Sequence, residues 1–215
     1  MLNLLNVPDM SKKRKTFLHR ISDLTRIHHR AAFADVQQRI SEHQGETPFL
    51  TLARNRYSCR SFSDKALTAK EINSLLEAAR VAPTAANRQP VHIWAICSEE
   101  GLARIRAVHP TFGAPAVLMV GVKPEAAWVR SYDGKNEAAT DAAITGTHLI
   151  LQAADLGLGS VWIGAFDPVK VREAFPETEG FEITALFAVG HPSADASPNP
   201  RHTERQPMES FATKL

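Results

Sequence analysis

Two guanidinium groups and a serine hydroxyl fall within five residues in the stretch Arg56-Tyr57-Ser58-Cys59-Arg60. In an extended backbone, alternate side chains point to the same side, so Arg56, Ser58 and Arg60 can face one ligand. Planar guanidinium forks and a short hydroxyl donor suit a phosphate group. An isolated stretch of this kind is more often solvated charge in a loop. Its position ahead of a second motif favours a phosphate site instead.

The second motif is the stretch A-P-T-A-A-N-R-Q-P at residues 82–90, which ends a predicted helix and turns between two prolines. Its amides, Asn87 and Gln89, each carry a donor and an acceptor, which suits the polar edge of a heterocycle. The alternative interpretation is a helix-terminating turn with solvated amides. Phosphate donors followed by groups that can bind a ring edge indicate a nucleotide-like cofactor.

These two motifs resemble those of the nitroreductase family of FMN-dependent oxidoreductases, which usually show R-R-S-x-R and then A-P-S-x-x-N-x-Q-P. The similarity covers about residues 50–210. It continues at D-A-A-I (141–144), L-G-L-G-S-V-W-I-G (156–164), V-G-H-P (189–192) and R-Q-P-M-E (205–209), the last close to the family's R-K-P-L-E. Tyr57 departs from the family's second arginine, and Thr84 replaces the more common serine but keeps its hydroxyl.

The resemblance implies that FMN is the cofactor and that NADH or NADPH is the electron donor. Arg56 and Ser58 would hold the phosphate, with Arg205 or Arg201 as a further ligand. Arg60 would lie near N1 and the C2 carbonyl of the flavin, where a fixed cation stabilises the reduced anion. The residues implied to bind the cofactor are Arg56, Tyr57, Ser58, Arg60, Pro83, Thr84, Ala85, Asn87, Gln89, Val161, Trp162, Ile163, Gly164, Ala165 and Arg205.

Two further parts of the site follow from the same resemblance. The backbone N–H groups of Gly164 and Ala165 would lie near N5 and O4 of the flavin, and a glycine there permits close approach. A polar loop at residues 123–136 is expected to overhang the flavin. Its candidate residues form either a substrate or nicotinamide pocket or a dimer surface: Trp128, Arg130, Tyr132 and Lys135.

Other kinds of site are not supported by the sequence. Gly157, Gly159 and Gly164 follow a helix and precede a strand, which is the reverse of a dinucleotide-binding fingerprint. No zinc-site spacing and no Gly-x-Ser-x-Gly motif is present, so we expect neither a metal nor a side-chain nucleophile. Cys59 lies between arginines, which favours reactivity, but a small filler residue is the simpler interpretation. The chemistry would therefore come from the flavin.

The elements that position these motifs follow from hydrophobic periodicity. Helices are predicted at residues 49–55, 68–81, 99–108, 137–156 and 167–175, and strands at 91–97, 114–123, 160–163 and 182–189. The alternation of strands with helices along the chain, taken by itself, favours a doubly wound parallel sheet. The resemblance implies instead an α+β, nitroreductase-like fold with a central, mainly antiparallel sheet flanked by helices. The helix at 137–156 is apolar on almost every side, which predicts a buried helix.

Two domains are expected, a basic helical extension with its linker at residues 1–48 and an FMN-binding domain at residues 49–215. Seven Lys or Arg residues and one acid lie between Lys12 and Arg30. This arm either contacts nucleic acid or an anionic membrane, or packs as a helix on the enzyme or its dimer partner, which we favour. The proline-rich tail from Pro192 onward cannot bury its own core, and the resemblance implies that it crosses to the other subunit of a homodimer.

The bulk composition, 44% hydrophobic and 22% charged over 215 residues, is that of a soluble globular protein. Two cysteines form no disulfide framework, and no apolar run reaches the ~20 residues of a membrane span, so we expect a cytoplasmic protein. The alternative is an organellar protein, because the basic, acid-poor N-terminal segment has the composition of a transit peptide.

The predicted function is that of an FMN-dependent oxidoreductase acting by a ping-pong mechanism. Hydride would pass from NAD(P)H through flavin N5 to a nitroaromatic, a quinone or another activated small-molecule acceptor. One alternative is a reductive dehalogenase or a flavin-consuming enzyme of the same fold. Another is a non-catalytic flavin-binding protein whose basic arm binds nucleic acid.

Overall fold

The computed structural model describes residues 47–215 of the chain. The basic helical extension and linker predicted at residues 1–48 lie outside the described residues except for residues 47 and 48, so the domain division at residue 48 stays a prediction. Helix α2 (Pro48–Asn55) leads directly into the first motif. Residues 52–215 form one compact unit.

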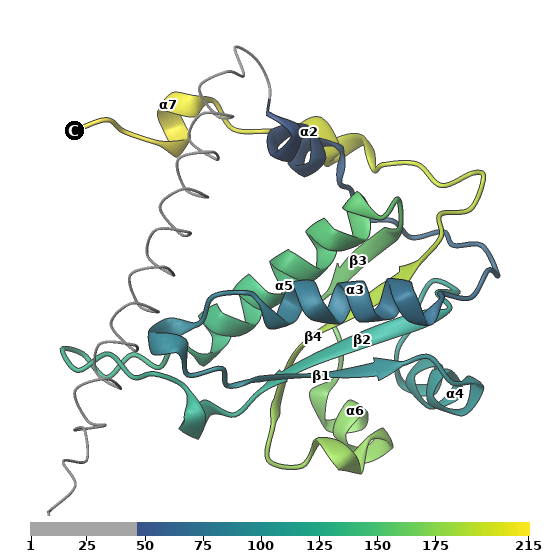
Figure 1. Cartoon of the computed structure of the whole chain (residues 1–215), viewed down its shortest axis with the longest axis horizontal. Helices are drawn as coiled ribbons and strands as arrows, with labels where there is room; N and C mark the ends of the chain where they lie inside the picture. The colour runs from purple at the N-terminus through teal and green to yellow at the C-terminus, as the bar shows by residue number, and fades with distance from the viewer. Residues whose placement is uncertain (1–46) are drawn as a thin grey trace, which may run out of the picture. The chain divides into compact units, whose positions relative to one another are not determined.

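A four-stranded sheet forms the centre of this unit (Figure 1). Its strands are β1 (Val91–Ile96), β2 (Ala116–Val122), β3 (Gly159–Ile163) and β4 (Glu182–Gly190), in the order β1-β2-β4-β3. Each neighbouring pair is antiparallel. The antiparallel sheet implied by the resemblance is therefore confirmed, and the parallel sheet favoured by simple alternation is wrong.

Helices cover both faces of the sheet. One face packs against α3 (Ala69–Arg80) and α5 (Ala138–Asp155), and the other against α4 (Glu99–Val108) and α6 (Pro168–Ala174). All seven residues of β2 are buried, as expected for a central strand with both faces covered. The remaining short elements are η1 (Ala85–Asn87), η2 (Pro124–Ala126), η3 (Pro176–Thr178), η4 (Pro200–Thr203) and α7 (Met208–Phe211).

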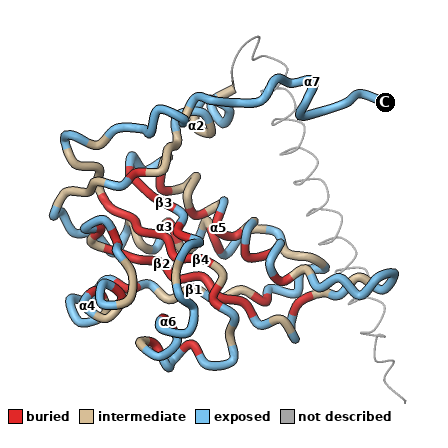
Figure 2. The backbone as a smooth tube through the Cα atoms, turned by 180° about the vertical axis from the view of Figure 1, so that it is seen from behind, coloured by how far each residue is buried: buried red, intermediate tan, exposed pale blue. Residues whose placement is uncertain are grey.

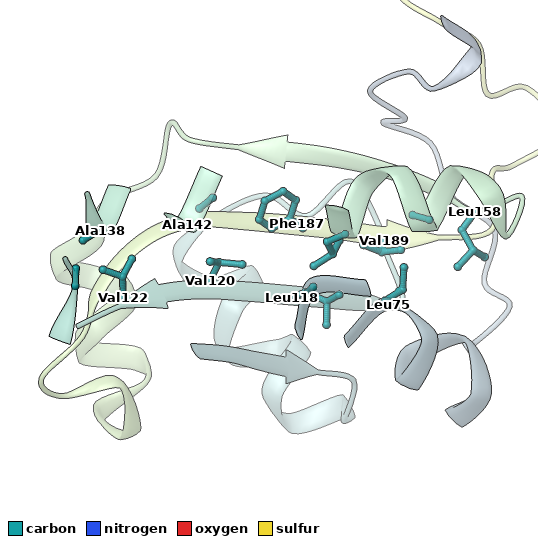
Figure 3. Packing of buried hydrophobic residues seen from close by; sticks show 14 residues of the cluster. Leu75, Leu118, Val120, Val122, Ala138, Ala142, Leu158, Phe187 and Val189 are labelled. Carbon is teal, nitrogen blue, oxygen red and sulfur yellow. The ribbon is translucent and has the colours of Figure 1, made fainter. Parts of the chain in front are cut away.

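The core under α3 and α5 is built from side chains that alternate along β2 and β4. Figure 3 shows several of them, among them Leu118 and Phe187, on the face of the sheet that α5 covers. Gly146 of α5 permits this close packing, because a Cβ there would lie 2.5 Å from the Phe187 ring and 2.8 Å from the Trp162 ring. The helix therefore lies close against the sheet at this point.

Helix α5 is less buried than its composition suggests. Figure 2 shows both buried and exposed residues along this helix. Its inner stripe is buried, but Ala139, Ala143 and Thr147 are exposed. The expectation of burial on almost every side is thus wrong for a single chain, because the sheet covers only one face of the helix. No helix among residues 47–215 combines the length and apolarity that crossing a membrane would require.

The C-terminal tail follows β4 and contributes nothing to the two cores. Most of its residues from Ser197 onward are exposed (Figure 2), and Met208 and Phe211 are 71% and 80% exposed. Its regular structure is limited to the single turns η4 and α7. The prediction that this segment buries no core of its own is confirmed.

Candidate functional site

The first motif runs beside the start of β3. The backbone N–H of Cys59 donates to the Ser160 carbonyl at 2.9 Å, and Ser58 forms an isolated parallel bridge with Ser160. Cys59 is fully buried, and a Cβ on Gly159 would lie 2.7 Å from its Sγ atom. Cys59 is therefore a small residue at a tight contact, and the motif is held extended against the sheet.

Arginines from both ends of the compact unit meet in one open groove. The first motif contributes Arg56, Ser58 and Arg60, and the tail contributes Arg201 and Arg205. The groove has a volume of about 810 Å³ and contains four guanidinium groups against one carboxylate, that of Glu204. Such an excess of fixed cations in a concave surface attracts an anion. The structure thus brings the predicted phosphate residues together, and both candidate tail arginines are among them.

The tail is attached to the first motif by His202. Its Nε2 atom lies 3.0 Å from the Arg54 carbonyl, and its ring packs edge to face on Tyr57 with centroids 6.3 Å apart. Burial, with Cys59 nearby, raises the pKa of Tyr57. Arg205 Nη1 donates to the His202 carbonyl at 2.7 Å, so its guanidinium is bound to its own turn. Tyr57, the departure from the resembled motif, therefore supports the tail rather than supplying a cation.

The second motif forms a turn with unusual backbone angles. Ala86, Asn87 and Gln89 have φ values of 51°, 54° and 52°, in the left-handed region that non-glycine residues avoid. The Gln89 backbone N–H donates to Thr84 Oγ1 at 3.0 Å, and the Gln89 side chain donates to Asn87 Oδ1 at 3.2 Å. Strained turns of this kind cluster at functional sites, and both amide side chains are exposed here.

Asp141 anchors this turn, a role that was not predicted from the sequence. Its Oδ1 atom accepts a hydrogen bond from the Ala85 backbone N–H at 2.8 Å, and the residue is 1% exposed. Asp141 appears in the sequence only as the first residue of the D-A-A-I motif. The available signal was an acidic residue in the otherwise apolar stripe of a predicted buried helix.

The two motifs lie at opposite ends of α5 (Figure 1). The first motif borders Ala154 and Gly157 at the end of this helix, and the second is bonded to Asp141 near its start. Asp141 and Ala154 are thirteen positions apart in the helix, which is about 20 Å at 1.5 Å per residue. A single chain therefore does not bring the two motifs together.

The segment predicted to pass the flavin face follows β3. Val161 and Ile163 are buried in the core under α4 and α6, so their side chains face away from α5. Trp162 points to the α5 side, is 36% exposed and packs edge to face on Phe187. Gly164 and Ala165 follow the strand and are exposed. The contact of their backbone N–H groups with the flavin stays a prediction.

The four candidate substrate residues lie in the loop between η2 and α5. Arg130 forms an ion pair with Asp133 at 2.6 Å, and Lys135 with Glu137 at 3.0 Å. Tyr132 is 95% exposed. Figure 1 shows this loop extending beyond the start of α5, whereas the first motif borders the other end of that helix. The structure does not gather these residues into a pocket with the first motif, so their role stays a prediction.

Pro83 and Ala85 begin the turn of the second motif, with Pro83 exposed and Ala85 partly buried. Beneath the turn is a smaller pocket of about 320 Å³, lined in part by Thr84, Gln89 and Thr145. Within residues 47–215, no group of three or more His, Cys, Asp or Glu side chains is placed to hold a metal.

Comparison with known proteins adds independent information. A model described as "Nitroreductase family" matches residues 53–109 and 106–191 of the chain. A protein of Archaeoglobus fulgidus named "Putative NADH dehydrogenase/NAD(P)H nitroreductase" is 27% identical over 158 residues, which cover 66% of this chain and 84% of that protein.

Solved structures agree with this match. A nitroreductase family protein from Clostridium difficile 630 is 32% identical, with a TM-score of 0.72, over 78% of this chain and 98% of that one. A "putative nitroreductase in complex with FMN" from Exiguobacterium sibiricum has a TM-score of 0.68 at 21% identity, over 80% of this chain and 99% of that one. At that identity the second likeness concerns the fold alone.

Proposed function

The chain belongs to the nitroreductase family, and on that premise we propose that it is an FMN-dependent oxidoreductase that uses NADH or NADPH as electron donor. The observation that carries the proposal is the groove in which Arg56, Ser58 and Arg60 meet Arg201 and Arg205. When bound, FMN supplies the redox chemistry, accepting hydride at N5 and passing electrons to an acceptor. The protein supplies binding, orientation and fixed charge.

The phosphate end of FMN fits the donor set of this groove. Arg56 and Ser58 offer a planar fork and a hydroxyl from one side of an extended backbone. Arg205 is our preferred third ligand, because it belongs to the motif R-Q-P-M-E, and Arg201 is its competitor in the same groove. Binding by Arg205 requires that its guanidinium leave the His202 and Glu204 carbonyls to which it is bonded here.

The ring end would lie along β3. From Ser160, which pairs with the first motif, to Gly164 is four residues, or about 13 Å of strand. Gly164 and Ala165 are exposed, and their backbone N–H groups would donate at a ring edge. Arg60, which is exposed and donates to the Ser58 carbonyl at 3.3 Å, would provide the cation at the pyrimidine side.

A second copy of the chain would complete the site. Since the second motif lies about 20 Å from the first along α5, we propose that Asn87 and Gln89 reach the flavin from the other subunit of a homodimer. The outer face of α5 suits such an interface, because its exposed residues Ala139, Ala143 and Thr147 are small and uncharged. The exposed apolar residues of the tail, Met208 and Phe211, would also be covered by a partner.

Turnover would be ping-pong, with the nicotinamide and the acceptor occupying the same place in turn. Acceptors would be small activated molecules such as nitroaromatics, quinones or activated alkenes. The loop carrying Trp128, Arg130, Tyr132 and Lys135 would contact them once a second subunit is present. No side chain is required to transfer a proton in this scheme.

Anaerobic reduction tests the proposed function. The purified full-length chain is mixed with FMN, passed through a desalting column and titrated with NADH or NADPH while flavin absorbance is followed. We expect retained flavin that is bleached by at least one nicotinamide and recoloured by a quinone or a nitroaromatic. Retained flavin that neither nicotinamide reduces would indicate a binding protein and would refute the enzymatic proposal.

A further inference from the structure

The turn of the second motif is held in an unfavourable conformation. Three of its residues, Ala86, Asn87 and Gln89, have φ values between 51° and 54° without being glycine. Such a backbone conformation is unfavourable for a residue with a side chain and persists only where the surroundings fix it. Two amide side chains leave the turn and are exposed to solvent.

Two hydrogen bonds run from backbone N–H groups of the turn to side-chain oxygens, beside the backbone bond from the Asn87 N–H to the Thr84 carbonyl at 2.9 Å. One is local, from the Gln89 backbone N–H to Thr84 Oγ1 at 3.0 Å. The other spans 56 residues of sequence and joins the Ala85 backbone N–H to Asp141 Oδ1 at 2.8 Å. Since Ala85 directly precedes the left-handed residues, the carboxylate fixes the point at which the turn begins. A hydrogen bond to a charged acceptor is also roughly twice as strong as one between neutral groups.

Burial of the Asp141 carboxylate at this position is energetically unfavourable. Among residues 47–215 Asp141 is the single acidic side chain that is buried, and its Oδ2 atom has no hydrogen-bond partner within that part of the chain. Burial of a charged group is unfavourable unless its contacts compensate. The N-terminal end of α5 offsets part of this cost through its partial positive charge. The side-chain hydrogen bond of Asp141 goes to the turn rather than to α5, so capping of α5 does not explain why an acidic residue is buried here.

We propose that Asp141 is a positioning residue of the cofactor site. Its carboxylate holds Ala85, and through it the left-handed turn, in the conformation that presents Asn87 and Gln89 to the flavin ring. The part that concerns the flavin rests on the proposed function. The part that concerns the turn does not, because it depends only on the bond between Asp141 and Ala85.

A double-mutant cycle tests the inference without any flavin. Glycine adopts positive φ at no steric cost, so Ala86→Gly should make the turn less dependent on its anchor. We expect Asp141→Ala to lower the urea midpoint of unfolding clearly in the native background and by less when Ala86→Gly is present. Equal losses in the two backgrounds would overturn the proposal. Should Asp141→Ala fail to fold, the same cycle is run with Asp141→Asn and judged by the same criterion.

Flavin affinity provides the second measurement. Asp141→Ala should weaken FMN binding by roughly tenfold, and it should weaken riboflavin binding by the same factor, because the effect lies at the ring and not at the phosphate. Asp141→Asn keeps an oxygen acceptor, so its flavin affinity should lie between those of the native chain and Asp141→Ala. Asp155→Asn, an exposed carboxylate at the other end of α5, is the matched control and should change neither value. Unchanged flavin affinity in Asp141→Ala would contradict the positioning role. If the native chain itself retains no FMN, the proposed function fails while the unfolding cycle still decides whether Asp141 holds the turn.

Discussion

The rings of Tyr57 and His202 pack edge to face at 6.3 Å, so the tail contacts the first motif of its own chain. This contact places Arg201 and Arg205 in the groove that Arg56 and Ser58 begin. If the tail crosses to the other subunit, the crossing therefore begins after the turn at Pro200–Thr203. For the residues after this turn, the exchange between subunits stays a prediction.

Removing the ring of His202 should loosen this attachment. His202→Ala loses the hydrogen bond to the Arg54 carbonyl and the contact with Tyr57, so we expect FMN affinity to fall by about three- to tenfold. Fluorescence titration of FMN measures the change. His109→Ala, at the end of α4, serves as the control and should bind FMN as the native chain does. Native affinity in His202→Ala would show that the tail is not needed at the phosphate.

The two arginines of the first motif should have separate effects. Arg56→Ala removes a charged donor to the phosphate, and we expect FMN affinity to fall by roughly 10- to 100-fold with a nearly unchanged reduction rate of bound flavin. Arg60→Ala should do the reverse, slowing reduction by NAD(P)H more than it weakens binding, because the cation stabilises the reduced ring. Stopped-flow reduction of flavin-saturated variants measures both. Equal effects of the two substitutions would contradict this division of roles.

Dimer formation should depend on the outer face of α5. Ala143→Arg places a charged, bulky side chain on that face, and we expect the variant to elute as a monomer and to lose at least tenfold in FMN affinity. Light scattering coupled to gel filtration reports the mass. Ala103→Arg, on the exposed face of α4, is the matched control and should remain a dimer. A monomeric native chain with full FMN affinity would refute the completed two-subunit site.

The start of α3 should contribute to acid sensitivity. Hydrogen bonds from the Thr68 backbone and side chain lower the pKa of Glu71. A carboxyl with a lowered pKa stabilises the folded state at neutral pH, and that contribution disappears as the pH falls below about 4.3 through the lower folded value. We expect Thr68→Ala to cost about 1 kcal/mol of unfolding free energy at pH 7 and less at pH 3. Urea unfolding at both values tests this, and a loss that does not decrease at pH 3 would be inconsistent with it.

Much of the fold follows from local patterns in the sequence. The predicted strands and helices of the compact unit agree with the structure to within two residues at each end, because runs such as Ala116–Val122 and the capping box at Thr68 specify their own structure. The antiparallel arrangement did not follow from periodicity, which says nothing about strand direction. It came from the resemblance of the motifs.

The site was predictable in its residue types but not in its assembly. The motif Arg56–Arg60 and the tail arginines were identified from side-chain chemistry, and the structure brings them together. The left-handed turn at Ala86 and its bond to Asp141 join residues 56 positions apart, a contact that no local pattern specifies. The separation of the two motifs along α5 could not be predicted either, since it depends on where the folded chain places each end of that helix.

The central claim is that guanidinium groups of the first motif and the tail bind the phosphate of FMN. Binding of FMN and of riboflavin, which lacks the phosphate, to the same full-length protein tests it most directly by isothermal titration calorimetry. The account predicts that FMN binds at least 100-fold more tightly than riboflavin, and that Arg56→Ala removes most of this difference. Equal affinity for the two flavins in the native protein would contradict it.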